Sequence, residues 1–459
     1  MKFQKICVLG LGYIGLPTAA TFATHGLKVH GVDINPVVIK TLQNGEIHIH
    51  EPGLQSVVES AIREGNLFVS TKPEEADAFI IAVPTPFQEN KHGEYNGRQF
   101  KLADMRAVTS ATEAILPFLR KGNLVILEST SPPQTTFGLV APILENSGLK
   151  AGSDFFLCYS PERVLPGQIL QELVENARVI GGVTPESAKA GRDLYASFVK
   201  GEIIETDATT AEMVKIMENT TRDVNIAIAN EFARLAEKFG VDVWEAIRLA
   251  NLHPRINILS PGPGVGGHCI SVDPWFFVEA APELTSLIYQ ARRVNDAQPH
   301  FVLDKVKQAF IALSGTERSR SSRSAKSSES ILSGKKIAAL GLAYKPDVDD
   351  LRESPATEVV HLLQEEGAVV KVWEPFKPDA IMKRIDMASG FESAIEDADA
   401  ILLLVKHTEF TKLKPDEIAT KTKSRILIDC VNAWDTNTWG KAGFKVYRLG
   451  VNKSQVSNH

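Results

Sequence analysis

Cysteine is scarce in this sequence of 459 residues, and its positions argue against two classes of site. The four cysteines, Cys7, Cys158, Cys269 and Cys430, lie far apart, and no C-x-x-C pair occurs. The spacing therefore favours neither a zinc site nor a redox dithiol. Separate thiols of this kind are typical of reduced proteins, so we expect a cytoplasmic location.

Long apolar segments and basic tracts are also missing. After the N-terminal segment, no stretch reaches the roughly 18 uncharged apolar residues that a membrane-spanning helix needs, so we expect no membrane span. The formal net charge is −6 and no long run of Lys or Arg occurs, so we expect neither nucleic acid nor a membrane as a partner. Residues 1–20 are apolar enough to resemble a short signal sequence, but their glycine spacing argues against one.

A globular chain of this length normally forms two or three domains. At the N-terminus, the segment 5–10 predicts a strand, 13–25 a helix, and the segment up to Asp33 a second strand. Strands at 78–83 and 123–129, with a helix near 104–119 between them, continue the alternation. Strands separated by helices need crossover connections, so the pattern predicts a doubly wound parallel sheet.

The pattern changes at residues 209–239, which contain neither Gly nor Pro and predict one amphipathic helix. Such a helix can join domains, form a dimer face or fill a core. Residues 314–333 are rich in Ser and predict a solvated linker, with phosphorylation or anion binding as alternatives. Strand and helix patterns then resume. The expected fold is α/β, with two Rossmann-like domains joined by the long helix. The expected boundaries are 1–208 (first Rossmann-like domain), 209–313 (central helical domain), 314–334 (linker) and 335–459 (second Rossmann-like domain).

Gly10, Gly12 and Gly15 form a G-x-G-x-x-G motif between the first strand and the first helix, and Asp33 ends the next strand. The glycines allow a tight turn, close approach of a pyrophosphate and close helix packing, and the helix N-terminus favours the anion. Because a carboxylate at Asp33 would bind the ribose hydroxyls and repel a 2′-phosphate, the motif predicts NAD as the cofactor in preference to NADP.

Two compact polar turns follow later strands, at 83–86 and 128–133, where the carboxyl edge of the sheet should face cofactor and substrate. Ordinary turn chemistry is the alternative explanation for each of them. The predicted cofactor-binding residues of this domain are Gly10, Gly12, Tyr13, Ile14, Gly15, Asp33, Pro84, Thr85, Ser129 and Thr130.

The segment 261–276, PGPGVGGHCISVDPWF, places Cys269 directly after a glycine-rich stretch. Glycines allow a ligand to approach the backbone closely, and a cysteine is a good nucleophile toward an aldehyde. An isolated cysteine is more often an inert core residue, but this setting favours a catalytic one.

With VDPWF after the cysteine, SPERVLPG at 160–167 and RDVNIAIANE at 222–231, the chain resembles the UDP-sugar 6-dehydrogenase family. The resemblance runs from the first strand to about Trp434, interrupted at the Ser-rich segment. Within the family it favours UDP-N-acetylmannosamine as the substrate, with UDP-N-acetylglucosamine or UDP-glucose as alternatives. UDP-glucose enzymes carry a basic residue and an acid where this chain has Val38 and Pro166.

The resemblance implies that 1–208 binds NAD and that 335–459 binds the UDP-sugar. It also implies a homodimer, a role in making surface polysaccharide precursors, and a set of functional residues. The implied roles are a nucleophile (Cys269), groups that stabilise oxyanions (Lys215 and Asn219), an acid for thioester hydrolysis (Glu162), and residues that hold the water and the lysine (Thr130 and Asp273). Further implied contacts are Arg163, Val164, Arg222, Gly266 and Lys345 to the substrate, Arg352 to the phosphates and NAD, and Arg255 to the neighbouring subunit's site. Lys215 and Asn219 are four apart, so they share one helix face.

The implied reaction removes two hydrides per sugar through a thiohemiacetal and a thioester on Cys269. A β-hydroxyacid dehydrogenase shares a Rossmann domain and a helix lysine but has no need of the G-G-H-C segment. A non-enzymatic NAD or UDP-sugar sensor would have no need of Cys269, Lys215 and Glu162 together.

Overall fold

The computed structural model describes residues 3–312 and 330–452 of the chain. Most of the predicted Ser-rich linker, 314–334, lies outside the described residues, and its role stays a prediction. The described chain divides into two compact units. Unit 1 contains the residues up to Asn219 together with Asp273–Thr285, and unit 2 contains Thr220–Val272 and the residues from Ser286 onward.

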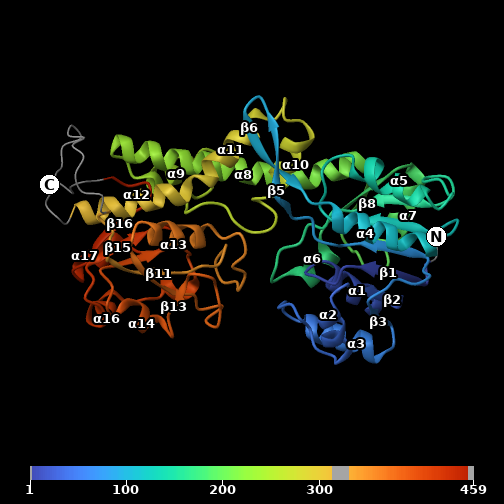
Figure 1. The fold of residues 1–459 in the computed structure, drawn as a ribbon, viewed down its shortest axis with the longest axis horizontal. Helices are drawn as coiled ribbons and strands as arrows, with labels where there is room; N and C mark the ends of the chain where they lie inside the picture. Colours follow the sequence, from blue (N-terminus) through green and yellow to red (C-terminus); the bar gives the residue numbers. More distant parts are fainter. Residues whose placement is uncertain (1–2, 313–329, 453–459) are drawn as a thin grey trace. The chain divides into compact units, whose positions relative to one another are not determined.

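Unit 1 is built on an eight-stranded sheet (Figure 1). In spatial order the strands are β10 (Ile203–Asp207), β9 (Arg178–Gly182), β8 (Phe156–Tyr159), β7 (Leu124–Leu127), β4 (Ala78–Ile81), β1 (Lys5–Leu9), β2 (Lys28–Val32) and β3 (Leu67–Ser70). The predicted parallel arrangement is confirmed for all neighbouring pairs in this sheet but one: β9 runs antiparallel to β8. A polar hairpin that the sequence pattern did not predict, β5 (Phe87–Tyr95) and β6 (Arg98–Ala103), forms a separate ribbon.

Alternating side chains of the strands feed two cores, as expected of a sheet covered on both faces. Ile6 and Val8 of β1 pack with one set of helices and Cys7 and Leu9 with the other. The first set is α1 (Gly15–Thr24), α2 (Pro36–Gln43), α3 (Leu54–Arg63), α6 (Ile169–Glu175) and α7 (Pro185–Tyr195), and the second includes α4 (Arg106–Ile115) and α5 (Ala141–Glu145). Helix α10 (Asp273–Ala280) completes unit 1.

The long helix predicted at 209–239 is confirmed as α8 (Ala208–Phe239). It ends because Gly240 adopts a left-handed conformation (φ 70°), and the N–H of Val241 returns to the carbonyl of Ala236 at 2.9 Å. This is the glycine stop that commonly closes helices. The helix belongs to unit 1 up to Asn219 and to unit 2 from Thr220, so it joins the two Rossmann-like domains.

Unit 2 contains a six-stranded, fully parallel sheet in the order β13-β12-β11-β14-β15-β16, the 3-2-1-4-5-6 order of a dinucleotide-binding fold. The strands are β11 (Lys336–Leu340), β12 (Val369–Trp373), β13 (Asp386–Met387), β14 (Ala400–Leu403), β15 (Ile426–Asp429) and β16 (Lys445–Arg448). The helices are α9 (Val243–Ala250), α11 (Ser286–Asp296), α12 (Gln298–Ile311), α13 (Pro355–Glu365), α14 (Phe391–Ile395), α15 (Thr408–Thr411), α16 (Pro415–Lys421) and α17 (Thr436–Lys441). The second α/β domain that the sequence predicts is thus present.

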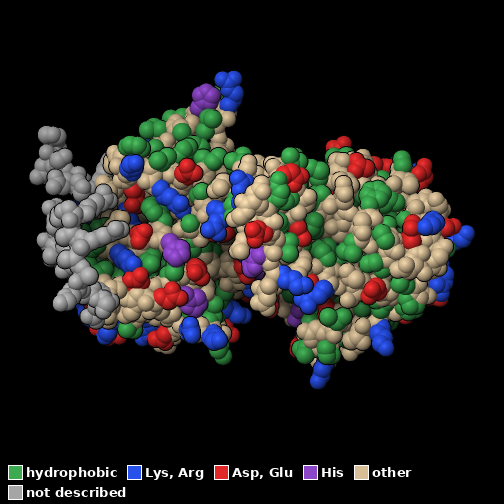
Figure 2. Space-filling model, turned by 45° about the horizontal axis from the view of Figure 1, so that its top comes forward, with side chains coloured by type: hydrophobic (Ala, Val, Ile, Leu, Met, Phe, Trp, Pro, Cys, Tyr) green, Lys and Arg blue, Asp and Glu red, His purple; other side chains and the backbone are tan. Residues whose placement is uncertain are grey.

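None of the described helices combines the length and the apolar character needed to cross a bilayer. On the face that Figure 2 shows, Lys and Arg side chains are interspersed with Asp and Glu side chains.

Candidate active site

The predicted NAD-binding motif of unit 1 has the geometry that its glycines require. Gly10 follows β1 with φ 94°, and a Cβ atom added to it would lie 2.5 Å from the carbonyl oxygen of Ala82. A Cβ on Gly15 would lie 1.8 Å from the carbonyl oxygen of Gly10, so only glycine fits there. A Cβ on Gly12 would meet no protein atom within 4 Å, which leaves its backbone open to a ligand. The cradle therefore fits a pyrophosphate at the start of α1.

Asp33 lies directly after β2 and faces the same turn. Its carboxylate accepts the N–H of Leu11 at 3.1 Å and the N–H of Asn35 at 2.8 Å. These bonds fix a negative charge beside the glycine turn, where it can accept ribose hydroxyls. Tyr13 and Ile14 are half-buried between the glycines.

Hydrogen bonds tie together the two polar turns at the carboxyl edge of the sheet. The Ser129 hydroxyl donates to the carbonyl of Val83, and the Thr85 hydroxyl donates to the carbonyl of Thr130, each at 2.7 Å. Pro84 lies between these contacts and is exposed. The structure thus brings together four residues predicted from two separate strand ends, at the edge where open α/β sheets bind ligands.

Helices α8 and α10 place Lys215, Asn219 and Asp273 together within unit 1. The Asn219 side-chain amide donates to Asp273 Oδ2 at 2.6 Å. Asp273 is the first residue of α10 and is only 1% exposed. Burial raises the pKa of Asp273 to about 6, and the charge of Lys215 and the Asn219 hydrogen bond oppose this rise. Lys215 and Asn219 therefore face one carboxylate from one side of α8, as their spacing predicts.

Glu162 follows β8 and is almost fully buried. Its Oε1 accepts the N–H of Arg163, and its Oε2 accepts the guanidinium of Arg178, both at 2.7 Å. Both carboxylate oxygens are thus held. The Arg163 side chain forms an ion pair with Glu218, and Val164 packs against the core of unit 1.

Cys269 lies in unit 2, at the end of the glycine-rich segment, and is exposed. The other three cysteines are buried, and no disulfide joins any of the four, all of which lie in the described ranges. Burial raises the pKa of the Cys7 thiol to about 12 and also raises the pKa values of the Cys158 and Cys430 thiols. Since the thiolate is the reactive form, Cys269 is the thiol best placed to react.

The glycines before Cys269 allow its segment to lie against the loop that follows β11. A Cβ added to Gly266 would lie 2.4 Å from the carbonyl oxygen of Glu353 and 2.7 Å from Pro355 Cδ. A Cβ on Gly267, which has φ 85°, would lie 2.8 Å from the Tyr344 ring. The Cys269 segment and the loop carrying Lys345 and Arg352 are therefore neighbours within unit 2.

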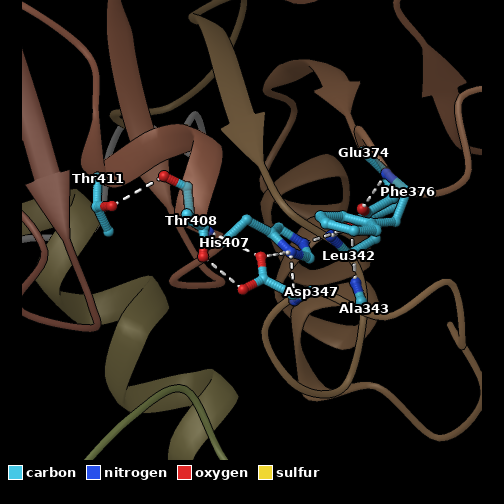
Figure 3. Close-up of polar contacts among 8 residues, drawn as sticks. All are labelled: Leu342, Ala343, Asp347, Glu374, Phe376, His407, Thr408 and Thr411. Atoms are coloured by element: carbon cyan, nitrogen blue, oxygen red, sulfur yellow. Dashed lines mark hydrogen bonds and ion pairs between the residues drawn. The ribbon is translucent and has the colours of Figure 1, made fainter. Parts of the chain in front are cut away.

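Glu374, at the end of β12, organises that loop (Figure 3). The fully buried carboxylate accepts the N–H groups of Leu342 and Ala343 at 2.7 and 2.9 Å and faces His407 Nε2 at 3.1 Å. His407 Nδ1 in turn accepts the N–H of Asp347 at 2.9 Å, so the imidazole donates from Nε2 to Glu374. Burial alone would raise the pKa of Glu374, but His407 and the backbone donors hold it below its ordinary value.

This arrangement distinguishes the second sheet from the first. Glu374 occupies the strand end that Asp33 occupies in unit 1, but it is buried and bonded to the turn after β11. Because Glu374 is fully buried, its carboxylate cannot reach the ribose hydroxyls of a ligand. The turn after β11 therefore does not offer the ribose contact that Asp33 offers in unit 1.

The remaining predicted residues lie in unit 2. Lys345 is half-buried next to the Tyr344 ring, with Nζ 5.9 Å from the ring centroid. Arg352 is exposed and forms an ion pair with Asp350 at 2.8 Å. Arg222, on α8, and Arg255, in the loop after α9, are exposed.

Comparison with known families covers most of the chain. Residues 4–199 match the NAD binding domain of the UDP-glucose/GDP-mannose dehydrogenase family, residues 209–297 its central domain and residues 338–436 its UDP binding domain. The chain belongs to this family. The predicted class, an NAD-dependent UDP-sugar dehydrogenase, and the predicted cofactor are thus confirmed.

Relatives from the family match over nearly their whole length. A UDP-N-acetyl-D-mannosamine dehydrogenase of Methanococcus maripaludis is 46% identical over 97% of both chains. An NDP-N-acetyl-D-galactosaminuronic acid dehydrogenase of Ralstonia solanacearum is also 46% identical, over 95% of this chain and 97% of its own. The solved structure of a UDP-N-acetyl-mannosamine dehydrogenase from S. aureus is 44% identical, with a TM-score of 0.84, and covers 97% of this chain and 99% of its own.

Some polar residues of this UDP-sugar dehydrogenase were not predicted from the sequence. Arg178, Glu374 and His407 each make buried polar contacts with a predicted site residue or its loop, and Glu128 in turn pairs with Arg178. Only Glu128 carried a sequence signal, because it opens the polar turn at 128–133. The others lie within or after ordinary strand patterns, and nothing local marks them.

Proposed function

We propose that this dehydrogenase oxidises the C6 alcohol of UDP-N-acetyl-D-mannosamine to a carboxylate, with Cys269 as the covalent nucleophile. The observation that carries the proposal is the exposed Cys269 at the end of a glycine segment, while the other three cysteines are buried. The relatives named for N-acetylated sugars support the substrate class. Two relatives of equal identity are named for two different N-acetylated sugars, so identity alone does not select the sugar. UDP-N-acetylglucosamine and UDP-glucose are the alternative substrates to test.

The proposed chemistry has two oxidations and one hydrolysis. NAD held by the glycine turn and Asp33 would supply the hydride acceptor for each oxidation, so two NAD would be consumed per sugar. Cys269 adds to the C6 aldehyde to give a thiohemiacetal, which prevents escape of the aldehyde and provides the alcohol for the second oxidation. Loss of the second hydride leaves a thioester on Cys269, which water converts to the acid and the free thiol.

The polar clusters of unit 1 supply the remaining roles in this proposal. Lys215 and Asn219 stabilise the negative charge on the C6 oxygen, because a cation and an amide donor lie on one helix face. Thr130 and Asp273 hold the water and the lysine. Glu162 takes the proton from the hydrolytic water, for which its buried, fixed carboxylate is suited.

Binding residues complete the proposal. Lys345 and Arg352 contact the UDP phosphates and NAD, because cationic side chains in the loop after β11 suit phosphate recognition. Arg163, Val164, Arg222 and Gly266 line the sugar and its nucleotide.

The covalent mechanism is tested by replacing Cys269. Wild-type enzyme should form two NADH per sugar acid and release no aldehyde to a carbonyl trap. Cys269→Ala should bind NAD normally but lose acid formation by several orders of magnitude, because no nucleophile captures the aldehyde. Cys430→Ala, which removes a buried thiol of the same unit, is the matched control and should retain the two-to-one stoichiometry. Near-normal acid production by Cys269→Ala would refute the mechanism.

The sugar is tested by comparing kcat/KM for UDP-N-acetylmannosamine, UDP-N-acetylglucosamine and UDP-glucose. UDP-N-acetylmannosamine and UDP-N-acetylglucosamine differ only in the configuration at C2, so both offer the same groups for binding and the sequence does not distinguish them. We expect UDP-N-acetylmannosamine to give the highest value. A higher kcat/KM for either alternative would replace it as the substrate.

We further propose a homodimer formed through α8 and α9. Apolar side chains on these helices and the loop after α9 are 40–71% exposed, among them Phe232, Phe239, Leu249 and Leu252. An apolar surface of this kind indicates a protein interface, and a second copy of the chain is the proposed occupant. Arg255, in the same loop, would then reach the neighbouring subunit's site. Light scattering should show a dimer, and Arg255→Ala should raise the UDP-sugar KM far more than the NAD KM; an active monomer would contradict both.

The cytoplasm is the proposed location. All four cysteines are outside disulfides, and one of them is an exposed thiol that the chemistry needs in reduced form. A reducing compartment preserves such a thiol. Fractionation of the source cells, with the activity in the cytosolic fraction, would support this location.

A further inference from the structure

Arg178, the first residue of β9, is a buried arginine, 5% exposed, at the carboxyl edge of the unit 1 sheet. Its guanidinium donates to Glu162 Oε2 at 2.7 Å and to the Ser160 hydroxyl at 3.1 Å. It also lies 3.5 Å from Glu128 Oε1. Burying a cation costs free energy unless anionic groups pair with it. Here the carboxylates of Glu162 and Glu128 both pair with the Arg178 guanidinium.

The direction of β9 explains how Arg178 reaches Glu162. Strand β9 is antiparallel to β8, with Cys158 opposite Gly182 and Tyr159 opposite Gly181. Continuing this register past the end of β8 places Glu162 opposite Arg178. In a parallel β9, the first residue would lie at the other edge of the sheet, away from Glu162. The single antiparallel pair of this sheet therefore delivers the guanidinium to the carboxylate.

A second carboxylate supports the arginine from behind. Glu128, at the end of β7, accepts a hydrogen bond from the Tyr195 hydroxyl, and the Arg178 guanidinium lies 4.2 Å from the centroid of the Tyr195 ring. Burial raises the pKa of Glu128 to about 7, although Arg178 opposes this rise. Two carboxylates and one guanidinium thus share a buried site, and the closer contact of the arginine is with Glu162.

We propose that Arg178 is a positioning residue for thioester hydrolysis, which it serves by fixing the Glu162 carboxylate, while Glu128 and Tyr195 fix the arginine. The proposal rests on the role proposed above for Glu162. In that step Glu162 takes a proton from water, the water oxygen bonds to the thioester carbon, and the carbon–sulfur bond breaks. Cys269 leaves as the thiolate and recovers a proton.

The consequence is specific to one step. Arg178 is buried, and Glu162 is the residue with a proposed catalytic role that it contacts, so its replacement should leave both hydride transfers intact. The Glu162 carboxylate has one backbone donor and one guanidinium donor. Without the second it can rotate away from the line of attack, and a displacement of about 1 Å costs a reaction on the order of 100-fold.

The test separates oxidation from hydrolysis in Arg178→Lys and Tyr195→Phe. Lysine keeps the charge but lacks the planar guanidinium that contacts Glu162 and Glu128 through separate nitrogens, and phenylalanine keeps the ring but loses the hydroxyl that holds Glu128. With UDP-N-acetylmannosamine and excess NAD, we expect a first-turnover burst of about two NADH per site in both variants. Steady-state kcat should fall about 10- to 100-fold in Arg178→Lys and less in Tyr195→Phe. Intact-protein mass spectrometry should show the acyl adduct on Cys269.

Two comparisons make the result decisive. Arg192→Lys, an arginine of α7 that pairs with Glu205 at the surface, is the matched control and should show no adduct. In a double-mutant cycle, Arg178→Lys should cost nothing further in a Glu162→Gln background, because both changes act through one carboxylate. The proposal would be overturned if, in both Arg178→Lys and Tyr195→Phe, the rate of the NADH burst fell as much as kcat and no adduct on Cys269 were seen. Absence of adduct in Glu162→Gln itself would instead refute the role proposed for Glu162.

Discussion

Asp273 offers a direct test of the buried cluster, because its charge is costly where the structure places it. The carboxylate is 1% exposed, and its pKa is raised from 3.8 to about 6. A carboxyl group with a raised pKa contributes stability that is complete below pH 4 and is lost as the pH rises through about 6. Asp273→Asn mimics the neutral form and should not suffer this loss.

The shift sets the expected size of the effect. At about 1.4 kcal/mol per pH unit, Asp273→Asn should be more stable than wild type by about 1 to 2 kcal/mol at pH 5 and about 3 kcal/mol at pH 8. Unit 1 is of a size for which 1 kcal/mol corresponds to about 2–4 °C, so the gain in Tm at pH 8 should be roughly 6–12 °C. Activity should fall, because the attraction between Asp273 and Lys215 is lost.

The assay is thermal unfolding of the full chain at pH 5, 6.5 and 8, with the Tm difference between variant and wild type as the readout. Glu113→Gln, an exposed carboxylate-to-amide change on α4, is the control and should give a small difference that does not depend on pH. A Tm difference for Asp273→Asn that stays constant from pH 5 to pH 8, or that favours wild type at pH 8, would refute the reasoning.

Three further predictions follow from other parts of the site. Gly266→Ala should raise the UDP-sugar KM at least about tenfold, because its Cβ would lie 2.4 Å from a carbonyl oxygen. NAD affinity, measured by fluorescence titration, should not change. The control is Gly262→Ala, whose Cβ meets no atom within 4 Å, and an equal effect of this control would contradict the prediction. His407→Gln should raise the UDP-sugar KM but not the NAD KM, because it loosens only the loop after β11, whereas His361→Gln on α13 should change neither. Asp33→Asn should reduce the kcat/KM preference for NAD over NADP about tenfold, since it removes one carboxylate from beside a 2′-phosphate; an unchanged ratio would argue against Asp33 as the selecting group.

The elements that were predictable are those whose pattern is local. The G-x-G-x-x-G turn, its flanking strands and the acid at Asp33 occur together within 33 residues, and the structure has all of them. Helix α8 was predictable because a stretch without Gly or Pro ends at Gly240. Lys215 and Asn219 share a face for the same reason, since helical spacing alone decides it.

The features that the sequence did not predict depend on contacts between residues far apart in the chain. The hairpin β5–β6 is mostly polar and exposed, so no alternation of apolar residues marks its strands. The local sequence can mark β9 as a strand, but it cannot give the strand's direction, because the direction depends on how β9 pairs with β8. Glu374 and His407 look like ordinary residues after strands until β12 and β14 lie on either side of β11.

By itself, the sequence determined the kind of chemistry this protein performs. The glycine turn with Asp33 indicates NAD, and the G-G-H-C segment with its flanking motifs indicates a UDP-sugar dehydrogenase. Only the tertiary structure decided the surroundings of these groups. It buries Asp273 and raises its pKa, leaves Cys269 exposed while it covers the other thiols, and sets Arg178 between Glu162 and Glu128. The physical reason is that burial and charge pairing are sums over neighbours that the fold selects from distant parts of the chain, whereas a motif is contained in adjacent residues.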